Sequence, residues 1–326
     1  MDTVSWGILS TAKIGVEKVI PAIQQAENCT VIGIASRSQE KADNAAKKLG
    51  ISTSYGSYQK LLNDHTIDAI YNPLPNHLHI PFTLKALEAG KHVLCEKPIA
   101  LDSQEAQKLK QKADAYPSLK VMEAFMYRFH PQWKKAKSLV THGEIGTLRT
   151  VNSFFSYFNN NPDNIRNKPD MGGGGLMDIG CYCISLSRYL FDKEPTDVSG
   201  SWKIDSKFGI DYLASGTLEF ESGTATFTCT TKTVPYQNVT IMGTNGRIVI
   251  EIPFNAPPNQ TTRIWLFKDG SKEEITFPPV NQYTLLAKAF ANAILKNTPV
   301  PTPLTDAINN MIAIDAFRKS AKSASN

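Results

Sequence analysis

The stretch VSWGILSTAKIGVEKVI, residues 4–20, decides the fold of the first part of the chain. Val4–Leu9 is an apolar run that predicts a buried strand, and the apolar spacing of Ile14–Ala26 predicts a helix directly after it. A strand that enters a helix through small residues is typical of a dinucleotide phosphate turn, because the backbone there approaches the pyrophosphate at the helix N-terminus. The residues predicted to contact the cofactor in this turn are Gly7, Ser10, Thr11, Ala12, Lys13 and Ile14. The strict G-x-G-x-x-G pattern is absent, so an ordinary small-residue turn is the alternative interpretation of this segment.

The alternation of strands and helices continues to about residue 124. Apolar runs predict strands at Thr30–Ala35, Ala69–Tyr71, His92–Cys95 and Val121–Ala124, and helical patterns occur between them at Gln39–Leu49, Ile80–Ala89 and Ser103–Ala115. Strands that alternate with helices form parallel βαβ units with right-handed crossovers. We therefore expect a doubly wound parallel sheet, a Rossmann dinucleotide-binding domain, over residues 1–124.

From about Leu148 the pattern changes to consecutive strands. These are predicted at Leu148–Phe158, Val198–Ile204, Leu213–Phe220, Thr224–Thr231, Asn238–Met242, Arg247–Ile252, Arg263–Phe267 and Glu274–Phe277. Short glycine-containing turns between several of them indicate a large, mostly antiparallel sheet. We expect a substrate and oligomerisation domain of α+β class over residues 125–302.

Few helices are predicted to cover this second sheet. The helical patterns are Leu176–Phe191, Tyr283–Leu295 and Thr305–Ala321. One face of the sheet is therefore expected to be open, with alternating apolar residues, and such a face usually meets a partner. We predict a homo-oligomer, a dimer or a tetramer, built through this face.

Length and composition limit the class of protein. The 326 residues suggest two domains, and no apolar run of about 18 residues predicts a membrane span. The net charge of +5 comes without any long basic run, so nucleic acid is not an expected partner. The five cysteines lack C-x-x-C spacing, and the first residues lack a leader pattern. We expect reduced cysteines in a cytoplasmic protein without a bound metal.

The end of the second predicted strand bears on cofactor choice. An Asp or Glu usually binds the free ribose 2′-hydroxyl there. This chain instead has Ser36 and Arg37, with Lys41 one helical turn further on. A hydroxyl and two cations suit a 2′-phosphate, since a guanidinium donates two hydrogen bonds to it. The sequence therefore predicts NADP(H) in preference to NAD(H), and a solvated surface Arg37 is the alternative.

Two further segments have residue types that suit catalysis. Lys97 follows the apolar strand His92–Cys95, at the carboxyl end where ligands bind in open parallel sheets. Asp178 and Tyr182 are four residues apart and are neighbours on one helix, beside its apolar stripe. The alternative interpretations are a surface Lys-Pro turn, a first-turn acid and a half-buried core tyrosine.

These residue types fit one reaction. Hydride transfer between nicotinamide and a carbonyl carbon needs a proton donor to the oxygen. The reference pKa of tyrosine is near 10, and a nearby lysine ammonium favours the phenolate and lowers it. We therefore predict a Lys97–Tyr182 pair, with Asp178 orienting substrate hydroxyls or tuning the pair. The sequence has no His/Asp/Glu cluster at metal spacing, which favours proton transfer by tyrosine and lysine over zinc.

At these residues the sequence resembles the glucose-fructose oxidoreductase / inositol dehydrogenase / rhizopine-catabolism (Gfo/Idh/MocA) family over nearly its whole length. The resemblance rests on WGILSTAKIG (6–15), LPNHLH (74–79), ALEAGKHVLCEKP (86–98) and GGGGLMDIGCY (172–182). It implies a Rossmann domain, a second domain with an open sheet, and a final helix, about 303–322, that packs back on the first domain. With a tyrosine at position 182, the sequence is similar to the branch that contains glucose-fructose oxidoreductase, NADP-dependent xylose dehydrogenase and dimeric dihydrodiol dehydrogenase.

The resemblance also implies residue roles. Lys97 and Tyr182 are the catalytic pair, with Asp178 beside them. The residues that match cofactor-lining positions are Ser36, Arg37, Lys41, Leu74, Pro75, Asn76, His79, Glu96, Lys97 and Arg166. Arg128 and Arg166 are expected on the nicotinamide and substrate side. Ser10 and Ala12 depart from the glycines common in the family.

We therefore expect an NADP(H)-dependent oxidoreductase that acts on a hydroxyl or carbonyl group of a sugar, a related polyhydroxylated ring or a cyclic diol. One alternative is a glycoside hydrolase that oxidises its substrate transiently with a tightly held cofactor. Another is a nucleotide-sensing module without catalysis. The combination of Lys97, Asp178 and Tyr182 argues against the sensing module.

Overall fold

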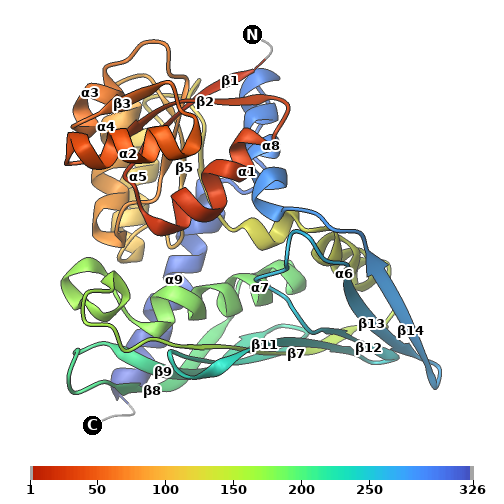
Figure 1. Cartoon of the computed structure of the whole chain (residues 1–326). Coiled ribbons are helices and arrows are strands. Elements are labelled where there is room, and N and C mark those ends of the chain that lie inside the picture. Colours follow the sequence, from red (N-terminus) through yellow and green to blue (C-terminus); the bar gives the residue numbers. More distant parts are fainter. Residues whose placement is uncertain (1–2, 324–326) are drawn as a thin grey trace. The chain divides into compact units, whose positions relative to one another are not determined.

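The computed structural model describes residues 3–323, and the chain divides into two compact units (Figure 1). The first unit contains Met1–Met126 and Asn281–Ile308. The second contains Tyr127–Val280 and the chain from Asn309 onward. The two units are described separately below.

The first unit is built on a six-stranded parallel sheet. Its strands are β1 (Val4–Leu9), β2 (Cys29–Ala35), β3 (Thr53–Tyr55), β4 (Ala69–Asn72), β5 (His92–Cys95) and β6 (Val121–Glu123). The spatial order is β3-β2-β1-β4-β5-β6, so successive strands are added in one direction from β1 to β3 and on the other side of β1 from β4 onward. This is the order of a doubly wound dinucleotide-binding fold, and it confirms the predicted Rossmann sheet. Ile8 and Leu9 are fully buried, and because consecutive residues of a strand point to opposite faces, β1 is covered on both faces.

The helices of this unit are α1 (Ile20–Gln24), α2 (Gln39–Leu49), α3 (Tyr58–Leu62), α4 (His79–Glu88), α5 (Ser103–Ala113) and α8 (Gln282–Leu295). Several begin at a side chain that caps the first turn. Ser38 accepts a hydrogen bond from the Lys41 N–H, and Asp102 accepts one from the Glu105 N–H. Such caps satisfy backbone donors that a helix leaves unpaired at its N-terminus. The short elements β3 and α3 were not predicted from the sequence.

Helix α8 joins the first unit although it follows the second sheet in the chain. The Phe290 ring packs on Trp6 of β1, with 5.7 Å between the ring centroids. The Asn28 amide donates to the Lys288 carbonyl oxygen at 3.1 Å and to the Asn292 amide oxygen at 3.0 Å. The predicted second domain, 125–302, therefore differs from the structure over the residues of α8.

The second unit is built on an eight-stranded mixed sheet. Its strands are β7 (Leu148–Phe158), β8 (Asp197–Ile204), β9 (Asp211–Phe220), β10 (Gly223–Thr230), β11 (Lys232–Gly243), β12 (Gly246–Ile250), β13 (Thr262–Lys268) and β14 (Ser271–Phe277). The spatial order is β14-β13-β12-β11-β7-β10-β9-β8. All neighbours pair antiparallel except β7 and β10, which are parallel. The predicted large, mostly antiparallel sheet is confirmed.

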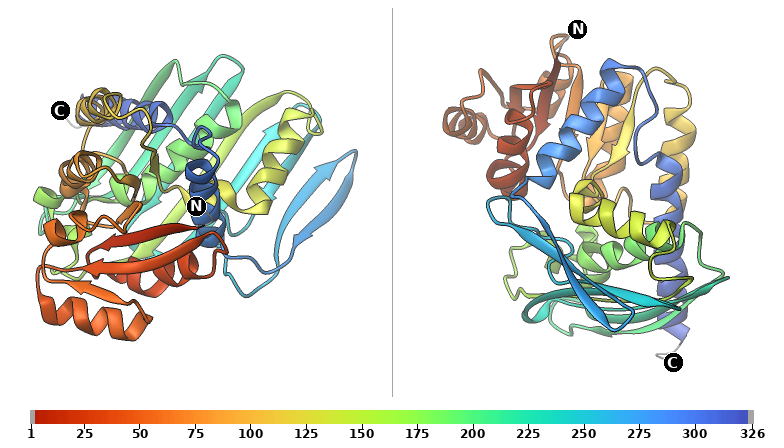
Figure 2. Two further views of the ribbon diagram at one scale, coloured as in Figure 1. Left: turned by 90° about the horizontal axis from the view of Figure 1, so that it is seen from above. Right: turned by 90° about the vertical axis from the view of Figure 1, so that its right-hand side faces the viewer.

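Helices cover one face of this sheet (Figure 2). They are α6 (Pro131–Thr141), α7 (Cys181–Phe191) and the part of α9 (Leu304–Ser323) from Asn309 onward. Most strand side chains on this face are apolar, and Val151, Ala225 and Ile241 are fully buried. Each Å² of apolar surface removed from water contributes about 25 cal/mol to stability. This apolar layer is therefore the core of the unit.

The position of α9 corrects the expectation that the final helix packs on the first domain. Only Leu304–Ile308 belong to the first unit. Further along, Phe317 lies against β8 and β9, where a Cβ at Gly200 would come within 2.3 Å of its ring. The Gly200 N–H also donates to the Ser320 hydroxyl at 3.3 Å. Glycine is required at this close approach, and it fixes the helix on the second sheet.

The opposite face of the sheet is covered by no helix within the described part of this unit (Figures 1 and 2). Its centre is not the alternating apolar surface expected from the sequence. Asn152, Thr217, Thr226 and Thr240 form one row across four strands, and the Asn152 amide donates to the Thr226 hydroxyl at 2.9 Å. Exposed apolar side chains occur nearer one end, where Phe158 and Tyr236 are 63% and 55% exposed.

Two findings bear on the surroundings of the chain. All five cysteines are free and buried. Between residues 3 and 323, no helix is both long enough and apolar enough to cross a membrane.

Candidate active site

The predicted cofactor residues of the first unit follow the carboxyl ends of four adjacent strands. Leu9 of β1 pairs with Ala35 of β2, Ile8 pairs with Tyr71 of β4, and Asn72 pairs with Cys95 of β5. Because parallel strands end at the same edge, the residues after them meet there. One edge of the sheet therefore carries Ser10, Ser36, Leu74 and Glu96. This edge includes the point between β1 and β4 where the order of strand addition changes sides. Ligands of open α/β sheets bind in this position.

The turn after β1 has the geometry of an anion-binding loop. Ser10 has φ +86°, a left-handed conformation that usually requires glycine. Its N–H donates to the Ala35 carbonyl oxygen at 2.9 Å, and its hydroxyl accepts from the Ala12 N–H at 3.2 Å. A helical segment begins at Lys13 and runs through a π-helical turn (Gly15–Val19) into α1, so the N–H groups of its first turn have no acceptor within the helix. This donor set fits a pyrophosphate, and the serine at position 10 does not prevent the turn.

The segment after β2 presents cations at the same edge. Ser36 is buried, whereas Arg37 and Lys41 are exposed. Tyr58, the first residue of α3, is close enough to Arg37 for that charge to oppose the rise that burial causes in the pKa of Tyr58. The sequence analysis did not identify Tyr58, because α3 itself was not predicted. A hydroxyl with two exposed cations fits a ribose 2′-phosphate.

His79 lies behind this edge rather than on it. Its side chain is 1% exposed, and its two ring nitrogens contact the carbonyl oxygens of Leu74 and Pro98, each at 2.7 Å. Burial lowers the pKa of His79 to about 4. His79 thus connects the loop after β4 to the loop after β5, and any effect on the cofactor is indirect. This differs from the expected direct contact.

Glu96 and Lys97 occupy the loop after β5. The Glu96 N–H donates to the Asn72 carbonyl oxygen at 3.0 Å, which extends the pairing of β4 and β5. The Tyr71 hydroxyl donates to Glu96 Oε1 at 2.7 Å, and burial together with this charge raises the pKa of Tyr71. The peptide between Lys97 and Pro98 is cis. Lys97 follows the last residue of β5, Cys95, by two positions, so it lies at the carboxyl end of that strand, as predicted.

In the second unit, Asp178 and Tyr182 lie on one helical segment. A π-helical turn over Leu176–Gly180 leads into α7, and the glycines before it form a tight approach. The Gly174 N–H donates to the Arg166 carbonyl oxygen at 2.9 Å, and the Gly173 N–H donates to the Lys168 carbonyl oxygen at 3.0 Å. A Cβ at Gly173 would lie 2.5 Å from the Arg166 carbonyl oxygen, so a larger residue does not fit there.

Asp178 is the centre of a charged cluster. Its Oδ2 accepts a hydrogen bond from the Tyr157 hydroxyl at 2.5 Å and pairs with the Arg166 Nε at 2.8 Å. The Asp178 charge raises the pKa of Arg166, and burial followed by the same charge raises the pKa of Tyr157. Arg166 thus remains a cation and Tyr157 remains a neutral hydroxyl donor. The sequence analysis did not identify Tyr157, although it shares the covered sheet face with Val151 and Phe155.

Tyr182 is held by aromatic rings. Its ring centroid lies 5.3 Å from that of Phe254, 5.8 Å from that of Phe155 and 5.9 Å from that of Tyr127. Tilted and edge-on contacts of this kind favour one ring orientation. The phenol is therefore fixed one helical turn after Asp178.

Arg128 contacts the same helix further along. Its Nη2 donates to the Ser185 hydroxyl at 2.9 Å, and its Nε donates to the Tyr127 hydroxyl at 3.3 Å. The guanidinium also lies 5.3 Å from the centre of the Tyr189 ring. These contacts anchor the segment before α6 to α7, and they place Arg128 at Ser185 rather than in the Asp178 cluster.

The structure thus assembles two groups of predicted site residues. The cofactor residues before residue 100, with Lys97, belong to the first unit, whereas Asp178, Tyr182, Arg166 and Arg128 belong to the second. The pairing of Lys97 with Tyr182 stays a prediction. Within residues 3–323, no group of three or more His, Cys, Asp or Glu side chains has the arrangement of a metal site.

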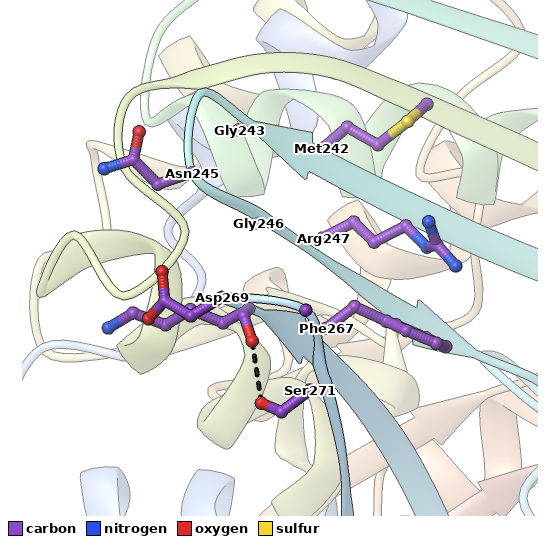
Figure 3. Close-up of a pocket in the computed structure, with 10 residues that line it drawn as sticks. Met242, Gly243, Asn245, Gly246, Arg247, Phe267, Asp269 and Ser271 are labelled. Carbon is purple, nitrogen blue, oxygen red and sulfur yellow. Dashed lines mark hydrogen bonds between the residues drawn. The ribbon is translucent and has the colours of Figure 1, made fainter.

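A hollow of ≈ 460 Å³ in the second unit lies elsewhere, at the turns between β11 and β12 and between β13 and β14 (Figure 3). It is lined by Met242, Gly243, Asn245, Gly246, Arg247, Phe267, Lys268, Asp269, Gly270 and Ser271. The Arg247 guanidinium stacks over the Phe267 ring at 3.9 Å, and the Ser271 hydroxyl donates to the Lys268 carbonyl oxygen at 2.7 Å. No predicted site residue lines it.

Comparison with known proteins relates both units to one family. A model described as an oxidoreductase family with an NAD-binding Rossmann fold (GFO/IDH/MocA) matches residues 4–125, and the GFO/IDH/MocA C-terminal domain matches residues 133–249. The uncharacterised oxidoreductase ORF334 of Rhizobium meliloti is 42% identical over 329 residues, with 99% of this chain and 98% of that protein covered. D-xylose 1-dehydrogenase (NADP(+)) 2 of Haloferax volcanii is 38% identical, with 97% of each chain covered.

A solved structure supports the same relationship. The crystal structure of KijD10, a 3-ketoreductase from Actinomadura kijaniata in complex with NADP and TDP-benzene, has a TM-score of 0.90 and 27% identity, with 98% of each chain covered. Together with the Rossmann sheet and the open mixed sheet, these matches confirm the predicted family. The chain belongs to the Gfo/Idh/MocA family and is an NAD(P)-dependent oxidoreductase that acts on CH–OH groups.

Proposed function

We propose that the protein transfers a hydride between NADP(H) and a hydroxyl or carbonyl group of a sugar, a related polyhydroxylated ring or a cyclic diol. The observation that carries this proposal is the helix with Asp178 and Tyr182, one turn apart. The Asp178 carboxylate is held by Arg166 and Tyr157, and the Tyr182 ring is held by three aromatic rings. Charged and hydroxyl groups beside a fixed phenol suit a substrate with several hydroxyl groups.

The residues have distinct roles in this proposal. Oxidation of a CH–OH carbon releases a hydride and the hydroxyl proton, and the Tyr182 phenolate accepts that proton. In the reverse direction the Tyr182 hydroxyl returns the proton to the carbonyl oxygen. The Lys97 ammonium favours the phenolate, and Asp178 accepts a hydrogen bond from a substrate hydroxyl. In this proposal Arg166, beside Asp178, faces the nicotinamide and the substrate, and Arg128 lies further along the same helix at Ser185.

When bound, the nicotinamide supplies the hydride acceptor or donor. Its dinucleotide is held at the edge of the Rossmann sheet. The turn with Ser10, Thr11, Ala12, Lys13 and Ile14 binds the pyrophosphate, with Gly7 in the strand before it, and Ser36, Arg37 and Lys41 bind the 2′-phosphate. The loops with Leu74, Pro75, Asn76, Glu96 and Lys97 line the remaining cofactor, with His79 behind them.

The function is tested by a substrate screen. Aldoses, inositols, keto-sugars and cyclic diols are assayed for a change in absorbance at the NADPH band, in both directions and with both cofactors. Steady consumption of cofactor with a sugar or diol supports the proposal. Cleavage of a glycoside without net cofactor turnover favours the hydrolase, and cofactor binding without any turnover favours the sensing module.

The cofactor preference has its own test. Arg37→Ala is expected to raise the KM for NADP(H) about 10- to 100-fold and to change the KM for NAD(H) little, because a hydrogen bond to a charged group contributes about 1.5–3 kcal/mol. Lys48→Ala, an exposed cation at the other end of α2, is the matched control. Equal losses with both cofactors would show that Arg37 does not bind the phosphate.

We further propose that the open face of the second sheet binds a second copy of the chain, in a dimer or a tetramer. The flat row of Asn152, Thr217, Thr226 and Thr240 supports close packing of two sheets. Phe158 and Tyr236 supply apolar surface at its end. Exposed apolar residues next to a flat face are typical of such interfaces.

This assembly is tested by light scattering after gel filtration. Thr226→Arg places a charge in the middle of the face and is expected to reduce the molar mass to that of the monomer, because two buried like charges would meet across the interface. Ser206→Arg, at an exposed position in the turn between β8 and β9, is the control. An unchanged assembly in Thr226→Arg would place the interface elsewhere.

The cytoplasmic location is also a proposal. Its support is the five free, buried cysteines, since oxidising compartments favour disulfides.

A further inference from the structure

A buried carboxylate outside the proposed active site begins strand β9. Asp211 is 8% exposed, and its Oδ2 accepts a hydrogen bond from the Leu176 N–H at 2.6 Å. Backbone hydrogen bonding at this end of the helical segment opposes the rise that burial causes in the pKa of the carboxyl group, and so favours its charged form. Leu176 is the first residue of the helical segment that carries Asp178 and Tyr182. The carboxylate therefore binds the N-terminus of that segment.

Gly174, which precedes the helical segment, lies directly against this carboxylate. Gly174 has φ +116°, a conformation that other residues rarely adopt. A Cβ at Gly174 would lie 2.1 Å from Asp211 Oδ1. Both the backbone conformation and the close approach require glycine at this position. Asp211 and Gly174 thus form one closely fitted unit.

The same glycine connects the two halves of the charged cluster. The Gly174 N–H donates to the Arg166 carbonyl oxygen at 2.9 Å, and the Gly174 carbonyl oxygen accepts from the Asp178 N–H at 3.0 Å. The side chains of Arg166 and Asp178 then pair at 2.8 Å. A shift of Gly174 would therefore move both partners of that ion pair.

We propose that Asp211 is a positioning residue that fixes the orientation of Asp178 and Tyr182 through the N-terminus of their helix. This inference rests on the proposed function, in which those two residues contact the substrate. Asp211 touches neither substrate nor cofactor in this account. Its carboxylate instead accepts the hydrogen bond from the Leu176 N–H, and this hydrogen bond is stronger when the acceptor is charged.

The surroundings of Asp211 predict how its ionisation affects stability. The charged or titratable groups that face it are Arg318 of α9 and the Cys229 thiol of β10. Burial outweighs Arg318 and the backbone donors and raises the pKa of Asp211 to about 7. An acid with a raised pKa in the folded state binds its proton more tightly than the unfolded chain does. Its ionisation therefore lowers stability as the pH rises from about 4 to about 7.

The test compares Asp211→Asn with wild type. Asparagine keeps the shape and an acceptor oxygen for the Leu176 N–H, but it removes the charge. We expect amide hydrogen exchange of residues 172–182 to become faster at pH 8, and kcat to fall about tenfold with an unchanged Kd for NADPH. In wild type, Asp211 makes the urea midpoint fall as the pH rises from about 4 to about 7, and we expect this part of the fall to be absent in the variant.

Asp205→Asn is the matched control from the same hairpin. Asp205 pairs with Lys232 at 3.0 Å, and the hydrogen bond from Lys232 contributes most to lowering the pKa of Asp205. We expect unchanged exchange of residues 172–182 and an unchanged kcat in this variant. Its stability loss should appear at high pH, which is opposite in sign to the Asp211 effect.

The outcomes separate this inference from the proposed function. Unchanged exchange of residues 172–182 in Asp211→Asn would overturn the inference, and so would faster exchange with an unchanged kcat. A wild-type protein without hydride transfer on any substrate would overturn the proposed function. In that case the inference fails with it as a statement about catalysis, while the exchange rates still decide whether Asp211 holds the helix.

Discussion

Replacing Tyr182 with phenylalanine is expected to lower kcat about 10²- to 10⁴-fold, the contribution of a positioned general acid or base. Phenylalanine keeps the contacts with Tyr127, Phe155 and Phe254, so the loss reports on the hydroxyl group and not on packing. The measurement is single-turnover oxidation of NADPH with the best substrate of the screen. The Kd of NADPH should change little.

The matched control is Tyr189→Phe. Tyr189 lies on the same helix, seven residues after Tyr182, and its phenol has no role in the proposed reaction. Its removal should leave kcat close to that of the parent. Full activity in Tyr182→Phe would instead exclude this phenol as the proton donor.

The partnership of Lys97 with Tyr182 is tested by combining substitutions. Lys97→Met is expected to lower kcat by a similar factor, because it removes the cation that favours the phenolate. If the two groups act as one unit, the double variant should be no slower than the slower single variant. If the loss of kcat in the double variant instead equalled the product of the two single losses, Lys97 would act independently of the tyrosine.

Replacing Asp178 with asparagine is expected to lower kcat/KM about 10²- to 10³-fold. The substitution weakens two charge-assisted contacts, from the Arg166 Nε at 2.8 Å and from the Tyr157 hydroxyl at 2.5 Å. Each such contact contributes about 1.5–3 kcal/mol, and the partial exposure of Arg166 reduces its share through solvent screening. The measurement is the steady-state rate with the sugar or diol identified in the screen.

Two comparisons make this result specific. Tyr157→Phe removes one donor but leaves the ion pair, so its loss should be smaller than that of Asp178→Asn. Asp163→Asn changes an exposed acid in the loop that also carries Arg166, and it should have no effect. If Asp178→Asn and Asp163→Asn behaved alike, Asp178 would have no part in substrate orientation.

Local sequence was informative where the structure depends on neighbours in the chain. The turn at Ser10 was predicted from small residues between a strand and a helix, and the backbone there adopts the left-handed conformation at a serine. The helix with Asp178 and Tyr182 was predicted from its spacing. These features follow from periodicity and sterics over a few residues.

Other features depend on contacts that the sequence order does not encode. Tyr157 reaches Asp178 across 21 residues only because β7 and α7 pack on each other. The assignment of α8 to the first unit depends on Phe290 meeting Trp6. His79 was predicted to contact the cofactor, but its depth and its two carbonyl partners could not be known before the loops were placed.

The sequence by itself determined the Rossmann sheet, the mostly antiparallel second sheet and the oxidoreductase family. The reason is that apolar periodicity and small-residue turns act locally. Only the tertiary structure decided that Arg166 and Tyr157 share the Asp178 carboxylate, that the open face has a hydroxyl-rich centre, and that Asp211 binds the start of the helical segment with Asp178 and Tyr182. These arrangements arise from packing between distant segments, where shape and desolvation select one partner among many of the same chemical type.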